Sequence, residues 1–394
     1  MPPRTTKDKV RFSLLAGLPA GFAAVTLGKL LSNVAFRLVF PFLPRIAEGL
    51  GVSLTALGTS LAIRELAALS TPALGRAADR RGHNPAMVVG LVALGVFLVI
   101  QGASNELVLF TIALVGVTVA KGLFDVAAGA WVGDAVPFHA RGRGIGLLET
   151  SWALAFIIGI PIAALLVRIS TWRTPFLVTA VLCTAMAGVL HVRLPRRGTT
   201  RAVPPAFTWS ARALTASVLL VIIGTAQAML LVTFASWLED EHGLSVAGIG
   251  ITAMVIGFAE LAGSVGTARF SDRIGLGKSL RITLAGAAGA SVLLIAGSSS
   301  LTAAIISMGL YFLVVEASIV TLLSVFSELD PDARATAFGV AFAGFAVGHA
   351  IGALSGALVY ENWGMTENAI TMAVLFGIGF LMTGARLRPV ELTP

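Results

Sequence analysis

The chain has 394 residues, of which 56% are hydrophobic and only 12% are charged, and its mean hydropathy is +0.90. Soluble domains carry about 25% charged residues, so the composition excludes a soluble protein and predicts an integral membrane protein. The net charge of +8 would also suit a nucleic-acid-binding protein, but the uneven placement of the basic residues favours membrane topology as its cause.

Long apolar runs separated by turn residues predict twelve membrane-spanning helices, because barrel strands would instead alternate in hydropathy. The expected helices cover residues 13–40, 53–75, 84–104, 107–132, 143–168, 174–192, 212–238, 245–267, 279–298, 301–326, 334–359 and 367–386. Ser53 and Ser245 are the expected N-caps of the second and eighth helices.

A polar, basic and proline-bearing segment, residues 193–211, separates the sixth expected helix from the seventh. It predicts a linker between an N-terminal six-helix half, residues 1–192, and a C-terminal half, residues 212–394. The basic residues predict the orientation. With a cytoplasmic N-terminus, 21 of the 28 Lys and Arg residues fall in the termini, the linker and the loops on that side, and only Arg45, Arg168 and Arg173 fall on the other.

One charged segment occurs twice, at a constant offset of 193 residues. The first copy ends the second expected helix and contains Gly75, Asp79, Arg80 and Gly82; Asp272, Arg273 and Gly275 repeat the last three. We expect each copy to be a charged turn between helices. Duplication at about half the chain length predicts two homologous halves, as in transporters that move one half against the other.

The pattern G-x-x-x-D-R-x-G after the second of twelve helices resembles the major facilitator superfamily. The segments Leu38–Pro44, Arg141–Gly144 with Glu149–Trp152, and Trp237–Glu239 resemble bacterial sugar- and drug-efflux-like members. The resemblance covers nearly the whole chain. It implies an all-α membrane fold of twelve transmembrane helices in two pseudo-symmetric six-helix halves. It also implies a central cavity lined by the first, fourth, seventh and tenth helices.

The same resemblance implies that Asp79 pairs near a neighbouring helix end and holds the cytoplasmic side closed, with Arg80 or Arg143 as its partner. Gly82 permits a tight turn. The expected conformational latch comprises Gly75, Asp79, Arg80, Gly82, Arg143, Asp272 and Arg273. The alternative is a basic loop with an incidental acid.

Ionisable residues inside the expected helices are costly to bury and indicate a polar cavity. The acids are Glu65, Asp125, Glu149, Glu260 and Glu316, and the bases are Lys29, Arg37, Arg64 and Lys121. Lys121 and Asp125 lie four residues apart and can pair on one helical face, whereas adjacent residues such as Arg64 and Glu65 do not face each other well. Glu149 is expected to pair with a loop arginine.

On the cavity-lining helices, the candidate substrate residues are Lys29, Asn33, Arg37, Lys121 and Gln227. Asp125 is the first candidate for a proton-carrying carboxylate, followed by Glu316 and Glu65; the alternative is a static ion pair that fixes helix packing. His349 is expected to be a hydrogen-bonded packing residue rather than a pH sensor. Gly159, Pro161, Gly348, Gly352 and Gly356 predict close helix packing and bending.

The predicted function is secondary active transport by alternating access, with proton-coupled efflux of a drug, sugar or metabolite. A proton symporter or facilitator that imports a metabolite is the alternative, and a non-transporting membrane sensor or scaffold is an alternative of another class. No enzyme, cofactor, metal or nucleic-acid signal is present in the sequence. We expect a monomer in the inner (plasma) membrane, with both termini in the cytoplasm.

Overall fold

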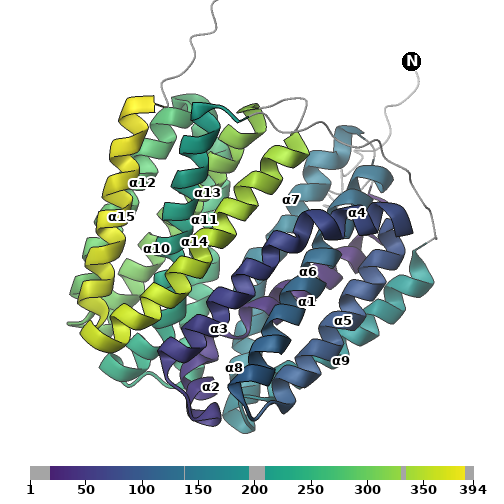
Figure 1. Cartoon of the computed structure of the whole chain (residues 1–394), viewed down its shortest axis with the longest axis horizontal. Coiled ribbons are helices and arrows are strands. Elements are labelled where there is room, and N and C mark those ends of the chain that lie inside the picture. The colour runs from purple at the N-terminus through teal and green to yellow at the C-terminus, as the bar shows by residue number, and fades with distance from the viewer. Residues whose placement is uncertain (1–17, 137, 195–208, 330–333, 387–394) are drawn as a thin grey trace, which may run out of the picture.

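The computed structural model describes residues 18–136, 138–194, 209–329 and 334–386, and within these ranges every regular element is helical (Figure 1). The N-terminal half contains α1 (Phe22–Arg37), η1 (Phe40–Phe42), α2 (Leu43–Leu50), α3 (Leu54–Leu66), η2 (Ala67–Ser70), α4 (Thr71–Arg81), α5 (His83–Ala103), α6 (Leu107–Ala135), α7 (Phe138–Leu154), η3 (Ala155–Gly159), α8 (Ile160–Ile169) and α9 (Thr174–Arg193). The C-terminal half contains α10 (Ala211–His242), α11 (Val246–Ile274), α12 (Leu276–Gly297), α13 (Leu301–Leu329), α14 (Arg334–Trp363) and α15 (Met365–Arg386).

These elements form twelve membrane spans, because α1 to α2, α3 to α4 and α7 to α8 each form one broken span. In the described part of the chain, 11 spans are long and apolar enough to cross a membrane by composition alone. The twelfth, Leu54–Arg81, carries more charged residues, including Arg64 and Glu65. The twelve-helix prediction is confirmed.

Prolines mark the breaks in the first, second and fifth spans. Pro41 lies in the 3-10 turn η1, and Pro72 is the second residue of α4, which follows η2 directly. Pro161 follows the π-helical turn η3. A proline lacks the backbone N–H that a helix needs, so the preceding turn changes its hydrogen bonding and the span bends.

The expectation that the duplicated charged segment forms a turn is wrong. Residues 75–81 continue the second span as part of α4, and residues 266–274 belong to α11. The chain turns only at Gly82 and Gly275, whose φ angles of 93° and 82° suit glycine. Charged residues at a membrane exit can stay helical, because water solvates their side chains. The predicted N-caps are confirmed, since Ser53 accepts from Ala56 N and Ser245 from Gly248 N.

Glycines bring several helices into close contact, as predicted. A Cβ atom at Gly352 would lie 2.1 Å from Thr225 O, and Gly348 and Gly356 approach the backbone of α10 similarly. A Cβ atom at Gly159 would lie 2.3 Å from a methyl carbon of Val34, which explains the tight contact of the fifth span with α1. Small residues allow helices to approach closely in membranes, where packing replaces the hydrophobic effect as the source of association.

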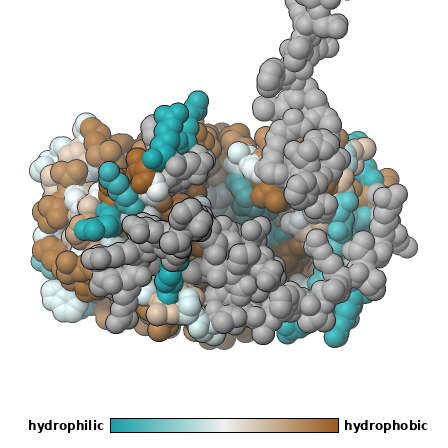
Figure 2. Space-filling model, turned by 90° about the horizontal axis from the view of Figure 1, so that it is seen from above, coloured by the Kyte–Doolittle hydropathy of each residue, from teal (hydrophilic) through white to brown (hydrophobic). Residues whose placement is uncertain are grey.

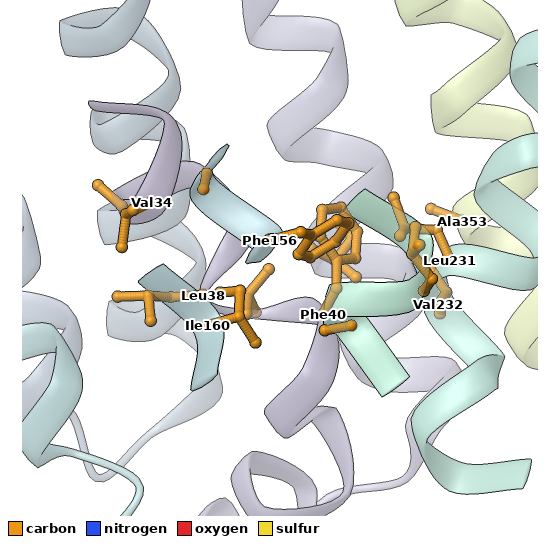
Figure 3. Packing of buried hydrophobic residues seen from close by; sticks show 14 of the residues in the cluster. Val34, Leu38, Phe40, Phe156, Ile160, Leu231, Val232 and Ala353 are labelled. Atoms are coloured by element: carbon orange, nitrogen blue, oxygen red, sulfur yellow. The ribbon is translucent and has the colours of Figure 1, made fainter. Parts of the chain in front are cut away.

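An apolar layer joins the two halves (Figure 3). Phe40, Phe156 and Ile160 of the N-terminal half face Leu231, Val232 and Ala353 of the C-terminal half, and all six are buried.

We call the end of the bundle that carries Gly82 and Gly275 the linker end, and the end that carries Gly51 and Gly364 the far end. Near the far end, a Cβ at Gly58 of α3 would lie 2.6 Å from Ala353 O of α14. The helices α3 and α14 lie together there and diverge toward the linker end (Figure 1). Seen from the linker end, the surface is hollowed between the halves (Figure 2). The described structure is therefore closed at the far end and open at the linker end.

Candidate functional site

The candidate site is a set of charged side chains on α1, α3, α6, α7, α11 and α13, between the two halves. Each of the four predicted bases in the spans contacts a carboxylate. This pairing lowers the cost of burying charges, because each ion is compensated by an opposite charge and by hydrogen bonds.

A buried ion pair connects the halves at this depth. Arg37 donates from Nη1 and Nη2 to the two carboxylate oxygens of Glu260, each at 2.8 Å, and both side chains are 2% exposed. The guanidinium carbon of Arg37 also lies 3.8 Å from the Trp152 ring centroid and 3.9 Å from that of Phe156. A two-pronged contact between planar ions fixes both distance and orientation, so this pair holds α1 against α11.

A second cluster lies within the N-terminal half. Lys121 contacts Asp125 one helical turn away, which confirms the predicted pair. Lys29 of α1 lies 2.9 Å from the same carboxylate, and Ser32 donates to it at 3.4 Å. Two ammonium groups therefore share Asp125. Glu149 is a weaker partner of Lys29, at 3.9 Å, and the loop-arginine pairing expected for it is not tested, since the side chains of Arg141 and Arg143 lie outside the described residues.

The expectation that Arg64 and Glu65 do not face each other well is wrong. Arg64 Nη2 donates to Glu65 Oε1 at 2.6 Å, although the residues are adjacent in α3. The long guanidinium side chain turns back because it also stacks on the Phe36 ring, at 3.9 Å, and donates to the Phe36 carbonyl oxygen at 3.2 Å. Glu65, a candidate proton carrier, is thus held by a cation.

The C-terminal half contributes mainly neutral contacts. Gln227 Oε1 lies 3.0 Å from His349 Nε2, so His349 is a hydrogen-bonded packing residue as expected. Glu316 of α13 accepts from the Ser264 hydroxyl of α11 at 2.8 Å. Asn33 donates to Ser151 at 3.0 Å, and its Oδ1 has no partner among the described residues.

The predicted latch residues do not contact the other half in the described structure. Asp79 lies 3.1 Å from His83 Nε2, and the other ring nitrogen lies 2.8 Å from Asp134. Arg80 was a predicted partner of Asp79, but His83 takes that place, four residues along the chain. The side chains of Arg143 and Asp272 lie outside the described residues. Arg273 is exposed, and a Cβ at Gly75 would meet nothing within 4 Å.

Polar contacts close the far end instead. Glu361 of α14 accepts from the backbone N–H groups of Leu54 at 2.5 Å and Thr55 at 3.1 Å, and from the Thr55 hydroxyl. Its carboxylate thus lies at the N-terminus of α3, where unpaired N–H groups and the helix dipole favour an anion. Arg45 lies 2.6 Å from Glu239 of α10 and forms a second link.

Sequence reasoning missed Glu260, Ser264, Glu361 and His83 as partners. Only the position of His83, one helical turn after Asp79, carried a signal, since residues four apart share a helix face. The other three meet their partners across large sequence separations, which no local pattern reveals.

A sequence model of the Major Facilitator Superfamily matches residues 25–329 and 216–393 of the chain. Among curated proteins, the uncharacterized MFS-type transporter YwfA of Bacillus subtilis (strain 168) is 28% identical over 171 residues, which cover 43% of this chain and 40% of YwfA. Multidrug resistance protein MdtG of Escherichia coli (strain K12 / DH10B) is 32% identical over 168 residues, 40% of each chain. The matched region thus spans 40% of the length of these relatives.

Solved structures share the fold over almost the whole chain. A bacterial homolog of the human lysosomal transporter Spinster has a TM-score of 0.74 at 16% identity, covering 92% of this chain and 95% of that chain. A mutant of the nucleoside transporter NupG has a TM-score of 0.75 at 14% identity, covering 92% and 98%. At these identities the likeness concerns the fold alone.

Proposed function

Because this chain belongs to the Major Facilitator Superfamily, we propose that it exports a small organic solute in exchange for protons, by alternating access. Membership itself makes it a multi-pass membrane transporter of small molecules. Three features support the finer proposal: the two halves, the closure at the far end only, and the charged site between the halves. The name of the relative MdtG, a multidrug resistance protein, supports export.

One observation carries the proton coupling. Asp125, Glu65 and Glu260 each contact a lysine or arginine at 2.9 Å or less, whereas the partner of Glu316 in the described structure is the neutral hydroxyl of Ser264. A carboxylate compensated by a cation has little reason to take up a proton. We therefore place Glu316 before Asp125 and Glu65 as the proton carrier.

We further propose that the linker end faces the cytoplasm of a cell whose inner (plasma) membrane holds the protein. Both termini and the segment 193–211 between the halves then lie in the cytoplasm, in agreement with the distribution of basic residues. The substrate enters from the linker end in the described state. Opening of the far end with closure of the linker end releases it outside, as in transporters built of two repeats. The transporter acts as a monomer.

Flux into proteoliposomes with an imposed pH gradient tests this function. A proton antiporter accumulates its solute in vesicles with an acidic lumen, whichever way the protein is inserted, and a proton symporter accumulates it in vesicles with an alkaline lumen. A compound panel is screened against protein-free vesicles, which correct for passive trapping of weak bases. Absence of flux for every compound would support a sensor or scaffold and contradict the proposal.

The role of Glu316 is tested in the same vesicles. Glu316→Gln is expected to abolish accumulation driven by the pH gradient and to keep solute exchange at saturating concentration. Glu367→Gln is the control, since Glu367 is an exposed acid at the start of α15. If Glu316→Gln keeps full gradient-driven accumulation while Asp125→Asn loses it, the proton carrier is Asp125.

A further inference from the structure

Two carboxylates in the site are held loosely. Glu149 has only Lys29, at 3.9 Å, as an ion-pair partner in the described structure, and Glu316 has the Ser264 hydroxyl. The other acids at this depth are tightly paired. The loose acids are therefore the ones free to bind something that enters from the linker end.

Among the charged side chains of the site, the most accessible one of the N-terminal half is an acid, Glu149. The side chains of Lys29 and Lys121 are 9% and 11% exposed, and those of Arg37 and Arg64 are 2% and 1% exposed. The Glu149 side chain is 59% exposed. Within the site, a solute that enters from the linker end therefore has readier access to the Glu149 carboxylate than to these buried bases.

The two loose acids belong to opposite halves. Glu149 lies on α7 and Glu316 on α13, and both border the Arg37–Glu260 pair. The Trp152 ring centroid, one turn after Glu149, lies 3.8 Å from the Arg37 guanidinium carbon, and Ser264, four residues after Glu260, donates to Glu316 at 2.8 Å. Among the described residues, the ion-pair partner of Glu149 is Lys29, which also contacts Asp125. Two carboxylates near the same buried ion pair repel each other, and a cation bound between them removes that repulsion.

The surroundings add an unmet acceptor and an aromatic surface. Asn33 is fully buried, and its Oδ1 has no partner among the described residues, while its Nδ2 donates to Ser151, two residues after Glu149. A carbonyl oxygen without a donor favours a positively charged or proton-donating ligand. Trp152 lies one helical turn after Glu149, and its ring centroid is 6.3 Å from that of Phe36. Both rings are partly buried and offer contact to an apolar body.

We propose that Glu149 and Glu316 together bind the charged group of an amphipathic organic cation, whose apolar part contacts Trp152 and Phe36. The inference rests on the proposed function and extends it by naming the substrate class. A cation held by one acid from each half draws the halves together at the linker end. A proton on Glu316 removes half of the binding charge, so proton and cation exclude each other, as exchange requires.

An organic anion fits this site poorly. Lys29 and Lys121, the two lysines of the site, both already contact Asp125. An anion would have to displace that carboxylate and pass Glu149 first. Electrostatic mismatch of this kind costs affinity and excludes the wrong charge.

Binding is tested on the full chain in lipid nanodiscs, without a gradient, with two probes of the same shape and opposite charge. Tetraphenylphosphonium is expected to bind saturably and tetraphenylborate is not. Glu149→Gln is expected to weaken tetraphenylphosphonium binding by about tenfold to a hundredfold, because one charged contact is lost. Glu367→Gln is the matched control and leaves binding unchanged. Acidification is expected to weaken tetraphenylphosphonium binding to the parent protein. Glu316→Gln is expected to weaken this binding at neutral pH and to remove most of its dependence on pH.

Preferential binding of tetraphenylborate, or unchanged cation affinity in Glu149→Gln, would overturn the proposal. So would the absence of saturable binding of both tetraphenylphosphonium and ethidium to the folded parent protein. The measurement is separate from the flux test. Cation binding that depends on Glu149, without gradient-driven flux, refutes only the proposed function. Gradient-driven flux of another solute that no aromatic cation inhibits refutes only this inference.

Discussion

Replacement of Glu260 by glutamine tests whether the ion pair between the halves stabilises the state that is open at the linker end. Glutamine keeps one acceptor for Arg37 but presents an amide NH₂ group to the other guanidinium nitrogen. The guanidinium is 2% exposed, and its Nε already lacks a partner in the described structure. Arg37 would therefore remain charged and buried with half of its compensation removed.

Removal of one partner from a buried ion pair costs about 3 to 5 kcal/mol. Glutamine keeps one hydrogen bond, so we take the lower value, about 3 kcal/mol. Arg37 lies at the break in the middle of the first span and joins it to α11 of the other half, so movement of the halves that opens the far end is expected to separate it from Glu260. The substitution then shifts the equilibrium between the two states by roughly 150-fold toward the far-open state. Arg37→Met combined with Glu260→Leu removes both charges and is expected to restore most of the equilibrium, since apolar residues often replace a buried pair at little cost.

The populations of the linker-open and far-open states are measured in a Cys183→Ser background, from distances between pairs of spin labels by double electron–electron resonance. Labels on exposed Arg81 and Lys278 report the linker end, and labels on exposed Glu106 and Asn362 report the far end. Glu260→Gln is expected to shorten the first distance and lengthen the second, and the double variant is expected to reverse both changes. A fall in melting temperature with unchanged distances would show that the pair holds the fold in both states. If neither the distances nor the melting temperature changed, both the proposed bias between the states and the estimated cost of about 3 kcal/mol would be refuted.

Three further outcomes are expected. Asp79→Asn leaves insertion and melting temperature near the parent values but strongly reduces flux in proteoliposomes, because a neutral amide replaces the carboxylate that contacts His83 and cannot form the charged contact expected when the linker end closes. Normal flux would exclude the latch role. Glu361→Gln removes an anion from the N-terminus of α3, where its interaction with the helix dipole contributes about 1 kcal/mol. The far-open state is then expected to be about fivefold more populated in the spin-distance assay. No shift would mean that this contact does not bias the two states. Gly352→Ala is expected to lower the melting temperature by several degrees, because its Cβ would lie 2.1 Å from Thr225 O. Gly377→Ala is the control, since a Cβ there would meet nothing within 4 Å, and it should leave the melting temperature unchanged. Equal melting temperatures would show that α14 can move away from α10 at no cost.

The sequence by itself determined the features that depend on local composition. Apolar runs of membrane-spanning length predict the number of helices, because each span must satisfy its own backbone and face lipid. The contact of Lys121 with Asp125, four residues apart on one helix, follows from helix geometry. The same geometry relates Asp79 to His83. The helical state of residues 75–81 was missed, because charge and glycine also indicate a turn.

Only the tertiary structure decided which charges meet. Arg37 and Glu260 are 223 residues apart, and Glu361 reaches the start of α3 from 307 residues away. Side-chain length and stacking on Phe36 brought Arg64 to Glu65, against the expectation from backbone spacing. Whether a buried carboxylate has a cation beside it depends on how separate helices pack. Among the acids of the site, this packing leaves Glu149 and Glu316 without a cation closer than 3.9 Å in the described structure, a distinction that the sequence alone does not contain.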